Sequence, residues 1–407
     1  MLRHKAVKSS SALKVLHIAP TPFFADRGCH IRIRNEIDSL SGHTVKVLLC
    51  TYHLGNDVQG MDIRRIPRIP GYRKLVAGFS PFKFPADILL FLLVLKTCWQ
   101  EKPDILHGHL HEGALIGWAV KILLFWRRIS LIMDMQGSLT GELVSYGTLT
   151  SGRLLARVAE VAESMICRMP DFIVYSSKES RKTLLTRFRV DAQQTALLQD
   201  VVPDIFFTER NKEQLCRKLG IPARKKVILY TGSLLPGKGV QHLVAAINIV
   251  CSRRDDLVFL LVGYPRGEIV SQVREYGLTD YVILPGQVAY ADLPGWLAVG
   301  DIALEPKESD SGEASGKLLH YMAVGLPVVC FDTANNRNFL GDAGFYAGEI
   351  SADSFADAIL AALDDRNAAV RGKQGREHIF RQYSMSEVGR LLRKIYKQLL
   401  EVSTTTA

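Results

Sequence analysis

A lysine flanked by glycines is the group in this chain that is best suited to a chemical role. Residues 227–239 read Val-Ile-Leu-Tyr-Thr-Gly-Ser-Leu-Leu-Pro-Gly-Lys-Gly, so a predicted strand ends in a glycine turn, Lys238 follows, and a helix should begin near Val240. Glycines let the backbone approach an anion, and the free N–H groups of a helix start bind it. A Walker loop is excluded because Gly239 stands where Ser or Thr is required. The stretch predicts a phosphate site, although alone it also fits an ordinary turn with a solvated lysine.

A second element of the same kind lies at 313–330, Glu-Ala-Ser-Gly-Lys-Leu-Leu-His-Tyr-Met-Ala-Val-Gly-Leu-Pro-Val-Val-Cys. Ser315 is a suitable N-cap for a helix of apolar spacing that ends at Gly325. The N–H groups of Gly316 to Leu318 should then point outward from the first turn. We therefore expect two helix starts to converge on one diphosphate.

Strands and helices alternate along the chain in two series. The first series has strands expected at 15–19, 45–50, 105–107, 131–135 and 172–176, with helices such as 31–40 and 112–124 between them. The second has strands at 227–231, 257–262, 282–284, 301–304 and 327–331, again separated by helices. Such alternation predicts parallel sheets covered on both faces, with ligands outside the carboxyl ends of the strands.

The polar, proline-broken segment 199–222 separates the two series and serves as a linker. We expect an α/β protein of two Rossmann-like, doubly wound parallel-sheet domains that face a central cleft. The N-terminal domain should span 1–203 and the C-terminal domain 204–383. A last helix within 384–407 should pack back on the N-terminal domain.

The charge is concentrated in the first half. Residues 1–200 hold 27 Lys and Arg against 17 Asp and Glu, whereas residues 201–407 hold 24 of each. The asymmetry favours an anionic partner such as a membrane surface, a phosphorylated lipid or nucleic acid. A solvated basic face without a partner explains it equally well. Basic and aromatic residues interleave over 64–102, which fits either a helix lying on an anionic membrane or a buried helix with a basic lead-in loop.

Other classes of protein are disfavoured by composition. The seven cysteines are scattered without a C-x-x-C pair, which suggests neither a disulfide framework nor a zinc site and fits a reducing cytosol. The apolar run 88–95 is far shorter than the roughly 20 residues that span a bilayer. Residues 1–13 are polar and lack the apolar core of a signal peptide. We expect a cytoplasmic protein, with peripheral attachment to the inner face of the membrane as a further possibility.

The two phosphate elements and several other segments together resemble the retaining glycosyltransferases of family four, which have the B-type two-domain fold. The first element is similar to the family's G-x5-K-G pattern and the second to its K-L-L-x-Y-M-A-x-G-x-P-V-V pattern. Pro-Asp-Ile-Leu-His-Gly-His at 103–109, Ser-Gly-His-Thr-Val at 41–45 and Val-Pro-Asp-Ile-Phe at 202–206 resemble further family motifs in the same order. The likeness extends over essentially the whole chain.

This resemblance implies a donor site in the C-terminal domain, an acceptor site in the N-terminal domain, and transfer with retention. Lys238 and the N–H groups of Ser315 to Leu318 would neutralise the leaving diphosphate in place of Mg²⁺, so neither a metal nor another cofactor is expected besides the UDP- or GDP-sugar. His109 would contact the transferred sugar, and Glu313 would stabilise its cationic form. The donor-binding residues implied are Gly28, Gly232, Ser233, Lys238, Ser315, Gly316, Lys317, Leu318 and His320.

The resemblance also implies the partners. They are the nucleotide-sugar donor and a glycan or lipid-linked acceptor, with an anionic membrane surface beside the basic half and without nucleic acid. Several positions depart from the family pattern. Ser233 replaces the usual Arg after the glycine, and His320 replaces the glutamate that is thought to bind the ribose hydroxyls. Gly312, with Glu313 beside it, stands at the position of the other glutamate, and the loop after the first strand has one glycine where many members have two.

Alternative functions are also compatible with the sequence. A sugar-nucleotide epimerase or hydrolase could use the same fold and release the nucleotide without an acceptor. A catalytically inactive nucleotide-sugar-binding partner is also compatible with Ser233 and His320. A nicotinamide dehydrogenase is disfavoured because no G-x-G-x-x-G follows the first expected strand. Asp134 and Gln136, at the end of another expected strand, should either line the acceptor site or cap the following turn.

Overall fold

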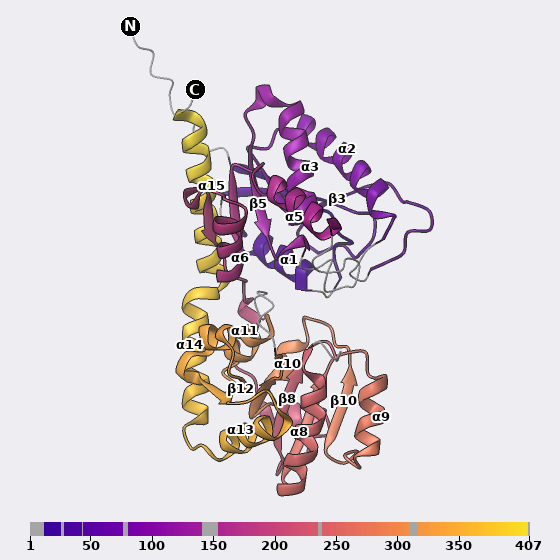
Figure 1. Ribbon diagram of the computed structural model, residues 1–407, viewed down its shortest axis with the longest axis vertical. Coiled ribbons are helices and arrows are strands. Elements are labelled where there is room, and N and C mark those ends of the chain that lie inside the picture. The colour runs from indigo at the N-terminus through magenta and orange to yellow at the C-terminus, as the bar shows by residue number, and fades with distance from the viewer. Residues whose placement is uncertain are drawn as a thin grey trace. The chain divides into compact units, whose positions relative to one another are not determined.

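The computed structural model describes residues 12–25, 28–42, 44–75, 80–140, 154–234, 238–308 and 316–405. The chain divides into two compact units (Figure 1). Unit 1 combines Met1–Val201 with Met385–Ala407, and unit 2 is Val202–Ser384. The chain thus leaves unit 1, forms unit 2, and returns to unit 1 for its last helix.

Unit 1 is built on a parallel sheet of seven strands in the order β3-β2-β1-β4-β5-β6-β7. The strands are β1 (Leu13–Ala19), β2 (Val45–Thr51), β3 (Asp62–Arg65), β4 (Ile105–His109), β5 (Ser130–Met135), β6 (Phe172–Tyr175) and β7 (Thr195–Leu197). The central strands β1, β4 and β5 are almost wholly buried, as expected for a parallel sheet covered by helices on both faces.

Helices cover both faces of this sheet. One face carries α1 (Gly28–Ser39) and α15 (Met385–Thr405), which contact each other. The other carries α2 (Lys83–Glu101), α3 (Leu110–Leu123) and α5 (Leu154–Ile166), and α3 contacts both of its neighbours (Figure 1). Val15 packs in the core cluster of α15, whereas Leu16 packs in the cluster of α2 and α3, so adjacent residues of β1 point to opposite layers.

Unit 2 has a parallel sheet of six strands in the order β10-β9-β8-β11-β12-β13. Its strands are β8 (Lys226–Thr231), β9 (Leu257–Val262), β10 (Val282–Gly286), β11 (Ile302–Glu305), β12 (Val328–Phe331) and β13 (Gly344–Ala347). Its helices are α7 (Lys212–Lys218), α8 (Val240–Arg253), α9 (Gly267–Glu275), α10 (Leu293–Leu297), α11 (Gly316–Ala323), α12 (Ala334–Leu340), α13 (Ala352–Asp364) and α14 (Ala368–Tyr383).

The predicted class, two doubly wound parallel sheets of the B-type glycosyltransferase fold, is confirmed. Several boundaries differ from expectation: α1 begins at Gly28 and α3 at Leu110, each earlier than predicted. The short strands β3, β7 and β13 were not predicted. Among the described residues, none of the helices combines the length and apolar character needed to cross a bilayer.

Candidate active site

In unit 2, the loops after β8 and β11 meet at the carboxyl edge of the sheet. Gly239, which precedes α8, has a φ of 77°, and a Cβ placed on it would lie 1.7 Å from the carbonyl oxygen of Pro306. Only glycine, which has no Cβ, allows the backbone to come this close to Pro306. On the next turn, the Nε2 atom of His242 lies 2.8 Å from Glu308 Oε1, which also accepts a hydrogen bond from Gln241. The start of α8, directly after Lys238, is therefore held to the loop that follows β11.

The start of α11 lies against the turn that ends β8. The Tyr321 hydroxyl accepts a hydrogen bond of 2.7 Å from the Thr231 N–H group, which fixes α11 to the strand end. The Lys317 ammonium lies 4.6 Å from the centroid of the Tyr230 ring and 3.9 Å from the position of a Cβ on Gly232. The fold thus brings together Gly232 from the first predicted phosphate element and Lys317 from the second.

The charge of Lys317 is balanced by a buried acid. Its Nζ atom lies 2.9 Å from Glu305 Oε1, and that carboxylate is only 1% exposed. Sequence patterns did not reveal this pair, because Glu305 follows the strand expected at 301–304, whereas in the structure it is the last, buried residue of β11. The pair lowers the positive potential that Lys317 presents, so the N–H groups of the first turn of α11 carry more of any anion binding at this position.

His320 occupies a defined pocket of aromatic side chains. Its ring stacks on Phe206 at a centroid distance of 4.2 Å, and its Nε2 atom forms a 3.0 Å hydrogen bond with the Tyr290 hydroxyl. Burial lowers the pKa of His320 to about 4, so the imidazole is neutral at physiological pH. A neutral imidazole can form hydrogen bonds with hydroxyl groups but adds no charge to an anion site.

The remaining predicted donor residues are placed as follows. Ser233 accepts a 2.8 Å hydrogen bond from the Tyr230 hydroxyl at its main-chain carbonyl. Gly316 opens α11, and Leu318 points into the hydrophobic core. Glu313 and Ser315 lie outside the described residues.

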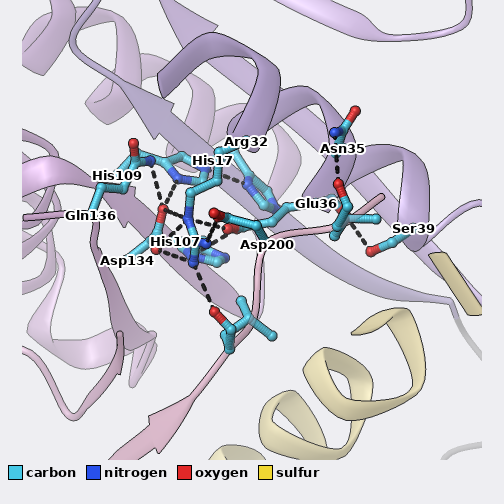
Figure 2. Close-up of polar contacts among 12 residues, drawn as sticks. His17, Arg32, Asn35, Glu36, Ser39, His107, His109, Asp134, Gln136 and Asp200 are labelled. Carbon is cyan, nitrogen blue, oxygen red and sulfur yellow. Dashed lines mark hydrogen bonds and ion pairs between the residues drawn. The ribbon is translucent and has the colours of Figure 1, made fainter. Parts of the chain in front are cut away.

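In unit 1, His109 stands at the carboxyl end of β4 and is completely buried. The strand register pairs His109 with Asp134 of β5 and His17 of β1 with His107. The Nδ1 atom of His109 lies 3.0 Å from Asp134 Oδ2, and its Nε2 atom lies 2.9 Å from His17 Nδ1 (Figure 2). Both ring nitrogens of His109 are therefore engaged inside unit 1.

A chain of hydrogen bonds continues from His17 to the C-terminal helix. The Tyr396 hydroxyl of α15 lies 2.7 Å from His107 Nδ1 and 3.4 Å from His17 Nε2. Since the Asp134 carboxylate only accepts, Nδ1 of His109 donates to it.

Arg32 of α1 is buried beside three carboxylates. Its guanidinium lies 2.9 Å from Asp134, 3.0 Å from Glu36, and in hydrogen-bond contact with Asp200 (Figure 2). Burial alone would raise the pKa of Asp134, but the charge of Arg32 and the bond from His109 outweigh it and hold that pKa well below its usual range. Burial and the charge of Asp134 raise the pKa of Glu36 well above its usual range, although the charge of Arg32 opposes them.

Glu36, His107 and His109 are the described group whose atoms come close enough to suggest a metal site, within 4.8 Å of one another. Their surroundings do not fit one. The ring nitrogens of His109 are already bonded, and the Arg32 guanidinium sits 3.0 Å from Glu36, where it would repel a second cation. The cluster serves instead as an internal polar core that holds the end of β4.

Asp134 thus has a different environment from the one predicted. It neither lines an open surface nor caps a turn. It is fully buried and accepts from Arg32, His109 and Gln136, the last at 2.7 Å. The sequence places a carboxylate at a strand end but does not show that a helical arginine will reach it.

The junctions near these residues are unusually tight. Leu110, directly after His109, has a φ of 61°, which is rare for a residue with a side chain. A Cβ on Gly108 would lie 2.6 Å from the Gly113 carbonyl, so strand and helix pack closely.

The loop after β1 is bonded to the start of α1. His30 of α1 forms a 2.6 Å hydrogen bond with Thr21 Oγ1 in that loop. Gly28 is the first residue of α1, and no atom lies within 4 Å of a Cβ built there.

His111 and Glu163 form a second buried ion pair, with 3.3 Å between Nε2 and Oε1. Glu163 of α5 also accepts from the main-chain N–H groups of Leu139 and Thr140, so the pair ties the segment after β5 to α5. Burial alone would lower the pKa of His111, but bonding to Cys167 and Glu163 outweighs it and raises the pKa to about 10. Burial alone would raise the pKa of Glu163, but the bonds from His111 and Thr140 outweigh it and lower that pKa to about 2.

These shifts predict a pH dependence of stability. Because the folded-state pKa of His111 is raised from 6.5 to about 10, its contribution is complete below pH 6.5 and is lost as pH rises through 10. His111→Gln should remove this alkaline loss, whereas His378→Gln, at an exposed position of α14, should leave it unchanged. Urea unfolding midpoints measured across that pH range test the prediction. Parallel curves for wild type and His111→Gln would contradict it.

Comparisons with known proteins agree with this architecture. Residues 28–199 match the family model "Glycosyl transferase 4-like domain", and residues 225–365 match "Glycosyl transferases group 1". An α-D-kanosaminyltransferase of Streptomyces kanamyceticus is 21% identical over 393 residues, which cover 91% of this chain and 99% of that protein.

Solved structures share the fold. Sucrose-phosphate synthase from Thermosynechococcus elongatus superposes with a TM-score of 0.78 at 18% identity, covering 96% of this chain and 100% of that one. Anabaena HepE in complex with UDP and glucose gives 0.73 at 15% identity, covering 95% and 99%. With both halves of the chain matched to glycosyltransferase models in the right order, the chain belongs to the family-four retaining glycosyltransferases of the B-type fold, enzymes that use a nucleotide-sugar donor.

Proposed function

We propose that the protein transfers a hexose with retention from a UDP- or GDP-sugar to a glycan or lipid-linked acceptor, without a metal ion. The observation that carries the donor assignment is the contact between the two phosphate elements of unit 2. Lys317 of α11 lies beside Gly232 at the end of β8, and the loop around Gly239 meets the loop after β11. The UDP and glucose bound to HepE, a protein of the same fold, support a nucleotide sugar as the donor.

In this proposal, unit 2 holds the diphosphate by charge and by main-chain groups. Lys238 and the N–H groups at 315–318 bind the phosphate oxygens, with Gly232 and Ser233 forming the turn beneath them. When the bond between the sugar C1 atom and the phosphate oxygen breaks, these groups stabilise the charge that develops on the leaving nucleotide. The acceptor hydroxyl attacks the same face of the sugar, and its proton passes to the leaving phosphate oxygen.

His320 and Glu313 contact the sugars of the donor in this proposal. The hydrogen bond to Tyr290 uses Nε2 of His320, which leaves Nδ1 as the ring nitrogen oriented for a ribose hydroxyl. A hydrogen bond from a neutral imidazole replaces the one that a glutamate makes elsewhere in the family. Glu313 stabilises the positively charged sugar ring in the transition state.

Unit 1 provides the acceptor side. Because the His109 ring is buried and bonded at both nitrogens, we propose that His109 contacts the transferred sugar through its main chain at the end of β4. The hydrogen-bonded rings behind it hold that strand end in place. Gly28, which has open space around it at the start of α1, lets the donor diphosphate approach that helix start.

The test is a donor screen for nucleotide release in the presence and absence of acceptor sugars. We expect acceptor-dependent turnover of a UDP- or GDP-hexose that is unchanged by excess EDTA, since cationic and amide groups take the place of the metal. Turnover that disappears with EDTA and returns with Mg²⁺ would contradict the metal-free mechanism. A rate of nucleotide release that does not depend on any acceptor would contradict the transferase proposal. NMR of the product anomer tests retention.

A further inference from the structure

Three neighbouring helices of unit 1 expose an apolar surface that the proposed reaction does not use. On α2 and α3, the residues that face the sheet are buried, whereas a second set of large apolar residues faces away from it. On α5, the described buried residues are Ala156 and Glu163, so its apolar side chains lie on the outside. The exposed set is Phe84, Ile88, Leu92, Trp99, Leu115, Ile122, Leu123, Leu154, Leu155, Val158, Val161 and Met165, together with Phe125 and Trp126 of the short 3-10 helix Phe125–Arg127 that follows α3. We call it the outer apolar face.

The outer apolar face holds more exposed apolar residues than a random scatter over the surface would place there. Fourteen of the 23 large apolar residues found exposed in the described chain fall on it. Since α3 contacts both α2 and α5, the three helices form one layer (Figure 1). A large exposed apolar surface on neighbouring helices marks a docking site.

Aromatic and basic side chains adjoin at one end of the layer. The Arg127 guanidinium lies 5.0 Å from the centroid of the Trp99 ring and donates a 2.8 Å hydrogen bond to the Cys98 carbonyl, which joins the ends of α2 and α3. Next to it, Phe125 is 74% exposed and Trp126 is 56% exposed. Tryptophan with arginine at the boundary between apolar and wet surroundings is the arrangement preferred at the interface of a bilayer.

The charges on the same helices have one sign. Within 83–102, 110–128 and 154–168, the exposed charged residues are Lys96, Lys102, Arg128, Arg157 and Arg168. The acidic residues in these ranges are not among the exposed ones, and each is bonded to a neighbouring side chain. They are Asp87, Glu101, Glu112, Glu160 and Glu163. The outer apolar face is therefore bordered by uncompensated positive charge.

We propose that the outer apolar face docks on the surface of an anionic lipid bilayer. Apolar side chains would enter the boundary between headgroups and acyl chains while the five basic residues bind lipid phosphates. A second copy of this chain is disfavoured as the occupant, because a two-fold interface would bring the same basic residues of both copies together. The inference goes beyond the transfer reaction and does not depend on which donor or acceptor is used.

The experiment is flotation of the full chain with vesicles of phosphatidylcholine alone or mixed with phosphatidylglycerol. We expect the wild type to float with the mixed vesicles and to be released by high salt, because the basic residues supply part of the binding. Phe125→Ser combined with Trp126→Ser should lower the vesicle-bound fraction by about tenfold or more, since both exposed rings would otherwise enter the interface. Both positions are exposed, so the fold should be preserved, as circular dichroism would show.

The matched control is Ile350→Ser combined with Val370→Ser, two exposed apolar residues of unit 2. It should float like the wild type. The proposal is overturned if the wild type stays with neither kind of vesicle or if the Phe125/Trp126 variant floats equally well. A dimer in solution that this variant abolishes would also overturn it in favour of a second copy. Nucleotide release measured on the same variants with a water-soluble acceptor reports the transfer reaction separately, so failure of one proposal is distinguishable from failure of the other.

Discussion

Lys238→Ala is expected to lower kcat/KM for the nucleotide-sugar donor by about 10²- to 10³-fold, the loss typical of removing one preorganised group from developing charge. The lysine stands directly before α8, where Gly239 brings the backbone against the carbonyl of Pro306. We therefore expect its ammonium to lie at the carboxyl edge of the sheet. The other nearby cation, Lys317, is already balanced by Glu305 and is not expected to compensate.

Steady-state nucleotide release with saturating acceptor measures this effect. Lys218→Ala, on the exposed face of α7, removes the same charge from unit 2 at a distance from the predicted phosphate elements and should keep wild-type turnover. Thermal unfolding of both variants should remain close to that of the wild type. Unchanged turnover in Lys238→Ala would remove the lysine from the site.

Arg32→Met is expected to cost about 3–5 kcal/mol of the free energy of unfolding, the range found when one partner of a buried ion pair is removed. The guanidinium is the cation between Glu36, Asp134 and Asp200, and its side chain is only 6% exposed. Without it, the buried Asp134 carboxylate would keep only the bonds from His109 and Gln136. Equilibrium urea unfolding measures the loss in the free energy of unfolding. Hydrogen exchange should become faster in β5 of unit 1 before it does so in β8 of unit 2.

The same helix offers a matched control for this prediction. Arg34 lies two residues away, is about a third exposed, and pairs with Asp38 at 3.4 Å. Surface pairs of this kind contribute up to about 1 kcal/mol, so Arg34→Met should have a small effect. Equal losses in the two variants would show that the buried cluster is not what stabilises unit 1.

The sequence revealed the fold well because the local signals agree with the tertiary structure. The apolar runs at 227–231 and 257–262 and the glycine turn at 232 become adjacent strands and a sharp turn, as the pattern requires. The strands that escaped prediction, β3, β7 and β13, are only three or four residues long and lie at sheet edges, and β3 is also polar, so none of them carries a long apolar pattern.

The sequence was less informative about the buried polar cluster. Neither His17 in an apolar strand nor Tyr396 in an amphipathic helix carries a local signal of its partner, because 379 residues separate them. Only the register of β1 against β4, and the return of α15 to the sheet, brings the rings together. A single arginine among the apolar positions of the first helix was the one available hint of a buried charge.

The discontinuity of unit 1 has a consequence for synthesis on the ribosome. Leu392, Ile395, Tyr396 and the other apolar residues of α15 complete a core whose remaining members come from the first 201 residues. Nascent unit 1 therefore cannot complete its core until the final helix has left the exit tunnel, because one face of its sheet is uncovered until then. Unit 2 is one continuous segment and emerges before the final helix, so the half of the protein made later is the first that can close its own core.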